Sequence, residues 1–112
     1  MITKSINVLG TEYTLNQEVL SSDNPALNAD YGFCDSSIKE INIAKFKSSE
    51  PDDLKNIKVF TDKVTRHEII HAFLEESGLS ECCEWARNEE MVDFFAQQIP
   101  KMVKVFNKIE VL

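Results

Sequence analysis

His67 and His71 are the only two histidines of the chain, and they stand in the sequence His67-Glu68-Ile69-Ile70-His71. In a helix, residues four apart lie on one face about one turn apart, so both imidazoles can reach one metal ion. Zinc accepts neutral imidazole nitrogens in a tetrahedral arrangement, and Glu68 would project beside the metal. Zinc lowers the pKa of water, and the Glu68 carboxylate can accept the proton. The spacing predicts a zinc site with Glu68 as general base.

The plain alternative is that both histidines merely sit on a helix that also contains a glutamate. Two histidines placed at random would take this spacing, with glutamate directly after the first, in well under about one chain in a hundred. Metal binding is therefore the preferred interpretation. A catalytic zinc usually takes three protein ligands and leaves its fourth position to water, so a third ligand must come from elsewhere in the fold.

A helix has to position the two histidines, and the flanking sequence predicts one over residues 62 to 77. Thr61 or Asp62 can cap its beginning, and Gly78 can end it. The segment Pro51-Asp52-Asp53-Leu54 is expected to open a short helical turn before it.

A further helix is predicted from about Glu81 to Gln98, with Ser80 as its cap. Pro100 is expected to interrupt it, because proline lacks the backbone N–H that a helix interior needs. A last amphipathic stretch then follows on the apolar residues Met102, Val105, Phe106 and Ile109. Aromatic residues at helical spacing more often pack in a core than bind a ligand. On that basis three are assigned to the core: Trp85, Phe94 and Phe95.

The first half of the chain alternates in the manner of β-strands. Apolar residues recur at every second position in four segments: Ile6 and Val8, Tyr13 and Leu15, Tyr31 and Phe33, and Ile41 and Ile43. Gly10 and the segment Asp35-Ser36-Ser37 supply turns within the two pairs. The sequence predicts an α+β domain over residues 1–112, with a small N-terminal antiparallel sheet followed by the helices.

The segment Asn88-Glu89-Glu90-Met91-Val92-Asp93 resembles the Asn-Glu-x-x-Ser-Asp signature of the thermolysin-like gluzincin metallopeptidases, with Val92 in place of serine. The resemblance implies that Glu89 is the third zinc ligand. The interval of 18 residues from His71 to Glu89 leaves room for a turn and a reversal of direction. Asp93 lies one helical turn after Glu89, so it can accept the second N–H of a zinc-bound histidine, the role of this aspartate in gluzincins.

Other interpretations of these residues were weighed against the gluzincin pattern. Glu90 is the neighbour that could take the place of Glu89, and an acidic, solvated helix start is the non-functional alternative for the segment. Leu74 and Ser77 stand where a metzincin would have glycine and histidine, which excludes that subclass. All three cysteines can bind zinc in principle, namely Cys34, Cys82 and Cys83. Cys83 is near enough to serve as a third ligand, but buried cysteine is more often part of a core.

The residue-by-residue match covers about Thr61 to Gln98, and the whole order of elements resembles a minimal zincin core. Small phage-encoded and bacterial metallopeptidases, including the ImmA/IrrE-like group, are similar, with a Glu-rich second helix running into Phe-Ala as in Glu89 to Ala96. The resemblance implies an endopeptidase with one zinc ion, in which an edge strand above the cleft pairs with an extended peptide. Either Tyr31 to Cys34 or Ile41 to Ala44 could be that edge. The resemblance assigns no residue to oxyanion stabilisation. Three residues are candidates for that role: Tyr31, Tyr13 and Arg66.

Composition restricts the partners. The balance of 12 basic against 19 acidic residues gives a formal charge of -7, which argues against nucleic acid and anionic membranes as partners. No apolar run reaches the roughly 20 residues of a membrane helix, and residues 1–5 lack the apolar core of a signal peptide. Three cysteines cannot all pair with one another, so a reducing, cytoplasmic setting is expected. The expected partner is a peptide or protein substrate.

Two other functional classes remain compatible with the sequence. One is a non-catalytic module or phage regulator that binds a protein partner and uses zinc as a staple. Its zinc site would be closed by four protein ligands, with Cys34 or Cys83 as the fourth. The other is a hydrolase that is active only in a complex, where a partner completes the missing oxyanion contact.

Overall fold

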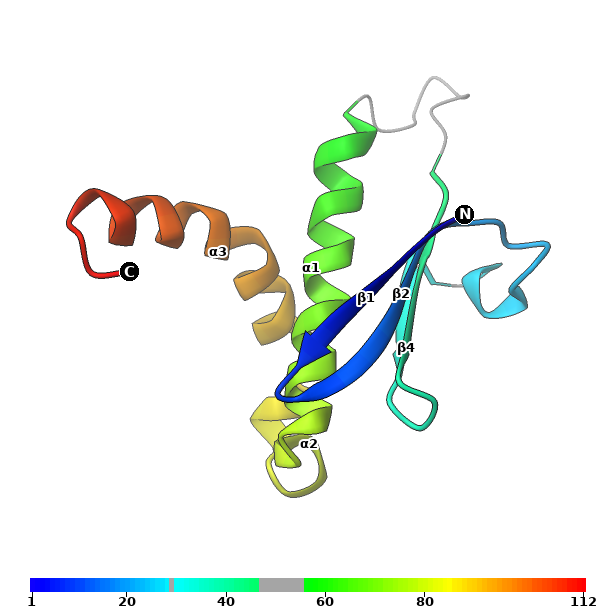
Figure 1. Ribbon diagram of the computed structural model, residues 1–112, viewed down its shortest axis with the longest axis horizontal. Coiled ribbons are helices and arrows are strands. Elements are labelled where there is room, and N and C mark those ends of the chain that lie inside the picture. Colours follow the sequence, from blue (N-terminus) through cyan, green and yellow to red (C-terminus); the bar gives the residue numbers. More distant parts are fainter. Residues whose placement is uncertain (29, 47–55) are drawn as a thin grey trace.

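The computed structural model describes residues 1–28, 30–46 and 56–112 as an α+β fold in which a four-stranded sheet precedes the helices (Figure 1). The strands are β1 (Ile2–Val8), β2 (Thr11–Val19), β3 (Gly32–Asp35) and β4 (Glu40–Ala44). The long helices are α1 (Ile57–Glu76) and α3 (Glu89–Lys108). Between and before them lie the short helices η1 (Pro25–Asn28), α2 (Leu79–Cys82) and η2 (Glu84–Arg87). The helical turn expected at residues 51–54 falls outside the described residues.

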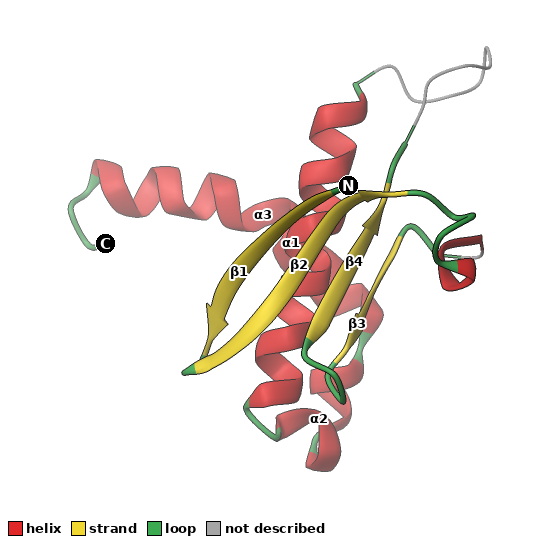
Figure 2. Cartoon of the chain, turned by 45° about the vertical axis from the view of Figure 1, so that its right-hand side comes forward, coloured by secondary structure: helices red, strands yellow, loops and turns green. Residues whose placement is uncertain are grey.

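The two predicted hairpins are present, but the sheet that they form is mixed and not antiparallel. β1 pairs antiparallel with β2, and β3 pairs antiparallel with β4. The hairpins then join through parallel pairing of β2 with β4, which gives the order β1-β2-β4-β3 (Figure 2). As expected, β1 and β2 turn at Leu9 and Gly10, both at positive φ, as two-residue hairpin turns require. β3 is therefore an edge strand, whereas β4 is interior.

The core lies between one face of this sheet and α1. Alternate residues of the strands are buried there, together with α1 residues that face them: Val8, Tyr13, Leu15, Ile41, Ile43, Val64 and Ala72. In Figure 2 the helices α1 and α3 lie behind the sheet, and no α-helix of the described residues covers the face turned to the viewer. The alternation in the sequence correctly identifies the core face of β1, β2 and β4, but it is wrong for β3. Gly32 and Cys34 stand opposite the buried Ile43 and Ile41, whereas Tyr31 is 64% exposed and Phe33 pairs with Asn42 on the other face.

Helix α1 begins five residues earlier than expected, at Ile57. The side chain of Asn56 caps it by accepting a hydrogen bond from the backbone N–H of Val59. Thr61 therefore lies inside the helix, where its hydroxyl donates to the carbonyl of Ile57. The end agrees with the prediction, because α1 stops at Glu76 and Gly78 follows at φ 81°, a conformation that glycine adopts without strain.

The helix predicted from Glu81 to Gln98 is broken into three pieces: α2, η2 and the beginning of α3. Ser80 does not cap it. Ser80 lies within α2, where its side chain is buried and its hydroxyl donates to the carboxylate of Glu75. The long helix starts only at Glu89, because Asn88 caps it by accepting a hydrogen bond from the N–H of Met91. This late start places Glu89 in the first turn of α3, beside α1.

Pro100 does not interrupt α3, contrary to the sequence prediction. A proline leaves the carbonyl four residues earlier without its helical donor, which here is the carbonyl of Ala96. The Nε–H of Arg66 on α1 donates to that oxygen at 2.6 Å. The lost helical bond is thus replaced from a neighbouring helix, and α3 continues with a change of direction visible in Figure 1.

The prediction that three aromatic residues lie in the core is wrong for two of them. Trp85 is 53% exposed and Phe94 is 55% exposed, while Phe95 is partly buried. On α3 the buried positions are Val92 and Ala96, and Phe94 lies between them on the opposite side of the helix. In η2 it is Ala86, not Trp85, that turns inward. No helix among the described residues is long and apolar enough to span a membrane.

Candidate metal centre

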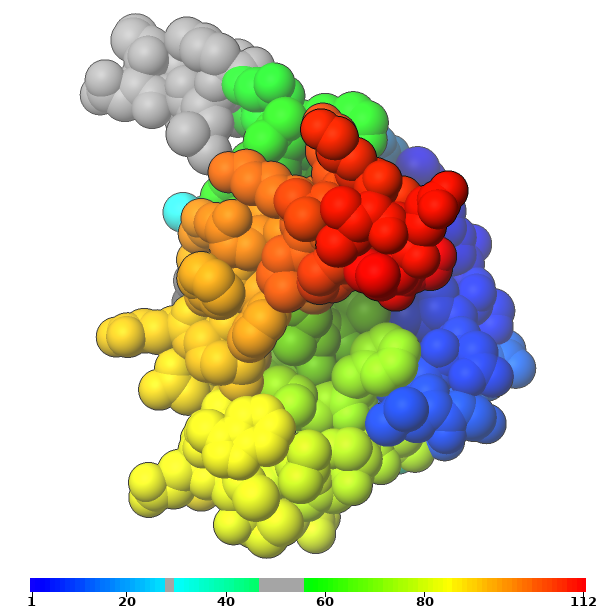
Figure 3. All heavy atoms as spheres, turned by 90° about the vertical axis from the view of Figure 1, so that its left-hand side faces the viewer, coloured from blue at the N-terminus to red at the C-terminus, as the bar shows by residue number. Residues whose placement is uncertain are grey.

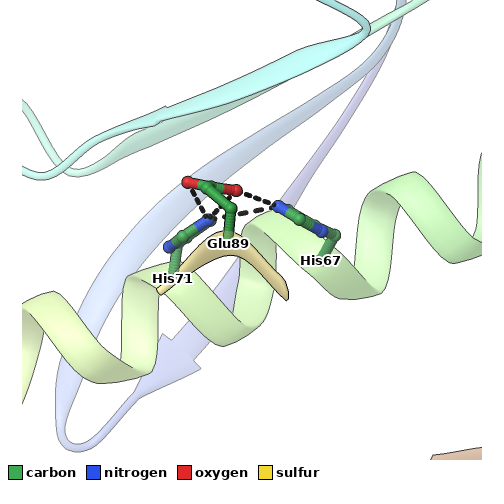
Figure 4. Close-up of side chains that lie close together, drawn as sticks. All are labelled: His67, His71 and Glu89. Carbon is green, nitrogen blue, oxygen red and sulfur yellow. Dashed lines mark hydrogen bonds and ion pairs between the residues drawn. The ribbon is translucent and has the colours of Figure 1, made fainter. Parts of the chain in front are cut away.

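His67 and His71 project from α1 toward Glu89 in the first turn of α3, and the three side chains converge (Figure 4). The Nε2 atoms of the histidines are 3.2 Å apart. Oε2 of Glu89 lies 2.9 Å from Nε2 of His67 and 3.2 Å from that of His71. Among the described residues, these three form the group of potential ligand atoms that could hold a metal ion, within 4.8 Å of one another.

The spacing of these atoms suits a tetrahedral ion. Nitrogen and oxygen ligands of zinc lie about 2.0–2.1 Å from the metal, so two such ligands in a tetrahedron are about 3.3 Å apart. The measured separations of 2.9 and 3.2 Å differ from this by a few tenths of an ångström. A small outward movement of Glu89, whose side chain is 70% exposed, would complete the fit.

Asp93 lies one turn further along α3 and faces the other side of the His67 ring. Its Oδ1 is 3.4 Å from Nδ1 of His67 and 3.4 Å from Nζ of Lys63. Its Oδ2 accepts a hydrogen bond from Gln97 at 2.7 Å. With the proton of His67 on Nδ1, facing Asp93, the lone pair of Nε2 points toward Glu89. With Nε2 of His71 also unprotonated, three electron-rich atoms meet at one point, where a metal ion could bind.

The surrounding charges keep the acidic members of the group ionised. Partial burial opposes ionisation of Glu89, but hydrogen bonds and positive charge from His71 and His67 lower its pKa. Asp93 behaves likewise, since burial is outweighed by Gln97, Lys63 and His67, and its pKa is lowered. Both carboxylates are therefore negative at neutral pH, as ligation and ligand orientation require.

Glu68 is the one buried carboxylate of α1, with 9% of its surface exposed. Burial raises its pKa to about 7, His71 opposes the shift, and the negative charges of Glu89 and Asp30 add to it. A carboxyl group with this pKa can both take up and release a proton near neutrality, as a general base must. The structure thus gives Glu68 surroundings quite unlike those of the exposed Glu89.

The group opens into a cleft of about 630 Å³ between α1, the beginning of α3 and the edge strand β3. Tyr31 to Cys34 form its wall on the sheet side, whereas Ile41 to Ala44 lie one strand further in and do not border it. Gly32 allows β3 to come close to α1. A Cβ atom at Gly32 would stand 3.2 Å from Cγ of Glu68 and 3.0 Å from Cδ1 of Ile43.

The other candidate ligands do not join the group. Glu90 is exposed and is not among the residues brought together with the two histidines. Cys34 lines the same cleft, but burial, followed by the charge of Glu68, raises its pKa to about 12, which disfavours the thiolate that binds metal. Cys82 and Cys83 lie next to one another with their sulfurs 3.6 Å apart, and neither lines the cleft or belongs to the group.

Of the three candidates for oxyanion stabilisation, only Tyr31 lines the cleft. The hydroxyl of Tyr13 donates instead to Glu76 at 2.8 Å. Arg66 does not line the cleft, and its Nε–H donates to the carbonyl of Ala96. Two cationic side chains that the sequence did not single out do line the cleft, Lys63 and Arg87. Lys63 stands four residues before His67, so its position on the same helical face could have been read from the sequence.

Comparisons with protein-family models, with curated proteins and with solved structures gave no match.

Proposed function

We propose that this protein is a zinc-dependent peptidase that hydrolyses peptide bonds in the cleft between β3 and α1. The observation that carries the proposal is the convergence of His67, His71 and Glu89 with ligand-like separations, next to the buried carboxylate of Glu68. Two imidazoles and one carboxylate are the ligand set of several catalytic zinc sites, in which the fourth position stays open.

His67, His71 and Glu89 would hold the ion, and Asp93 would keep the His67 ring in place by accepting its Nδ1–H. Zinc, when bound, supplies Lewis-acid chemistry: it acidifies water and polarises a carbonyl group. Glu68 takes the proton from the attacking water and then delivers it to the nitrogen of the departing amine. Glu68 lines the same cleft as the three proposed ligands, so its carboxylate can reach a water molecule and a substrate bound there.

The edge strand supports a peptide as the substrate. Among the described strands, β3 pairs only with β4, so its other edge keeps backbone N–H and C=O groups that can bind an extended chain. This edge borders the same cleft as the metal group. A peptide added to β3 would therefore pass directly over Glu68, which Gly32 allows to lie against the strand.

The non-catalytic alternative requires a zinc site closed by four protein ligands. Neither Cys34 nor Cys83 belongs to the group, and within the described part of the chain no fourth side chain joins it. The group also borders an open cleft and not a sealed interior. Both observations favour a catalytic site over a purely structural one.

The test is a cleavage assay on a peptide library with zinc-loaded protein, with products identified by mass spectrometry. The matched variant is Glu68→Gln, which keeps the shape of the side chain and the metal ligands but removes the base. We expect cleavage by the wild type, none by the variant, and inhibition by a chelator that is reversed by zinc. Cleavage at the same rate by both proteins would overturn the role of Glu68.

A further inference from the structure

A second groove lies between the first turns of α1 and the middle of α3, and it has a volume of about 540 Å³. Its floor and rim come from Asn56, Val59 and Phe60 on one side and Gln97 and Gln98 on the other. In Figure 3 the orange atoms of α3 lie beside the green atoms of α1 at this face of the molecule. None of the residues with the proposed catalytic roles lines it.

The charge of this groove is opposite to that of the protein as a whole. Three cationic side chains line it, Lys63, Arg66 and Lys101, and no described carboxylate does. The whole chain carries a formal charge of -7. Lys63 has a partial counter-charge in Asp93, 3.4 Å away. Arg66 and Lys101 form no ion pair with any residue that the structure describes, and the only hydrogen bond of Arg66 there is to a backbone carbonyl.

The basic groove is continuous with the metal cleft. Phe60 and Lys63 line both spaces, and Nζ of Lys63 lies 5.6 Å from the centre of the Phe60 ring. An extended chain that leaves the cleft past Phe60 and Lys63 would therefore enter the groove that Arg66 and Lys101 also line. The amides of Gln97 and Gln98 add neutral donors along the same path.

We infer that the groove binds an acidic segment of a peptide whose neighbouring part lies in the metal cleft. Carboxylate side chains would pair with Lys101, Arg66 and Lys63, in a protein whose surface otherwise repels anions. The binding itself needs no hydrolysis; only the identification of this peptide as a substrate rests on the proposed function.

The test uses fluorescein-labelled hexaglutamate and hexaglutamine as probes, with fluorescence anisotropy at low ionic strength. The protein is the full chain with Glu68→Gln, so that neither probe can be cleaved. The variant is Lys101→Glu, because the Lys101 side chain is exposed and forms no ion pair with a described residue. The control is Lys104→Glu, an equal change of charge on an exposed residue of α3 outside the groove.

We expect hexaglutamate to bind more tightly than hexaglutamine, and we expect Lys101→Glu to weaken the binding of hexaglutamate by about fivefold, the upper end of what one exposed ion pair contributes. Lys104→Glu should change the affinity by less than about twofold. Equal weakening by both variants, or equal affinity for both probes, would overturn the inference. The anisotropy assay measures binding without turnover. A negative result in it would therefore leave the peptidase proposal standing, and a lack of activity in the cleavage assay would leave the acidic-peptide proposal standing.

Discussion

Glu68 and Glu76 lie about two turns apart on α1, and both reach toward the sheet, but their surroundings are opposite. Glu76 accepts hydrogen bonds from the hydroxyls of Thr11 and Tyr13 and from Lys39, at 2.7 to 2.9 Å. These hydrogen bonds lower the pKa of Glu76 to about 2. The bond from Thr11 has the largest effect, followed by those from Lys39 and Tyr13. Burial instead raises the pKa of Glu68 to about 7.

The two regions around these carboxylates therefore do different work. Glu76 links the end of α1 to β2 and to the turn before β4 through the three hydrogen bonds that its carboxylate accepts. The carboxylate of Glu68 is instead buried, next to the three side chains that could hold a metal ion, and its pKa of about 7 allows it to exchange a proton near neutral pH. The fully paired carboxylate of Glu76 stabilises the fold, whereas the buried carboxylate of Glu68 beside an open cleft is the group that we propose as the general base.

The largest expected effect comes from exchanging each of the two carboxylates for its amide. Glu68→Gln should reduce peptide hydrolysis by about a thousandfold, within the range of general-base catalysis, and leave the Tm unchanged or higher. Glu76→Gln should leave hydrolysis within about twofold and lower the Tm. Steady-state kinetics and thermal unfolding of both variants measure this. Loss of activity in both, with equal loss of stability, would erase the contrast between the two regions.

Asp93→Asn should weaken zinc binding between about 10- and 100-fold, because the amide lacks the charge that supports the Nδ1–H of His67. Competition with a chromogenic chelator measures the affinity. Asp62→Asn, on the surface of α1 where Asp62 pairs with Lys58, is the control with the same change of charge. An unchanged zinc affinity in Asp93→Asn would mean that Asp93 does not orient the ring.

Gly32→Ala should lower hydrolysis about tenfold without loss of zinc. The added Cβ would stand 3.2 Å from Cγ of Glu68, so the base must move by a few tenths of an ångström. The same Cβ would also crowd Cδ1 of Ile43 at 3.0 Å, so the measurement is repeated together with Ile43→Val, which removes that atom. Recovery of full activity in the double variant would show that crowding of the core, and not displacement of Glu68, causes the loss.

The smallest effect expected is a dependence of stability on acid pH through Glu76. Its pKa in the folded chain is about 2, below its ordinary value of 4.5, so the unfolded chain binds the proton first as the pH falls. The stabilisation is thus complete above about pH 5 and is lost progressively between about pH 5 and pH 2. Thermal unfolding across this range should show a shallower decline in Glu76→Gln than in the wild type. Parallel curves would contradict the assignment.

The parts of the fold that sequence alone could predict are those set by local pattern. Alternation identified the strands and the core residues of β1, β2 and β4, though not those of β3. The i, i+4 spacing placed His67 and His71 on one face of one helix. The turn at Gly78 was likewise readable, since helices commonly end at a glycine with positive φ. Glu89 entered through its resemblance to a known signature, and the structure brings it to within 2.9 Å of His67.

The parts that could not be predicted depend on contacts between distant residues. Parallel pairing of β2 with β4 joins two hairpins and leaves no mark in either of them. Pro100 stays inside α3, where Arg66 on another helix donates to the carbonyl of Ala96 that the proline leaves without its helical donor. The closeness of Gly32 to Glu68 arises in the same way, from the packing of an edge strand on α1.

The most direct test of the account is the metal content of the protein, measured by plasma mass spectrometry after purification without chelators. Wild-type protein and the double variant His67→Ala/His71→Ala are compared under the same conditions. We expect about one zinc ion per wild-type chain and little in the variant. Absence of zinc from the wild type even after reconstitution, or equal zinc in both proteins, would contradict it.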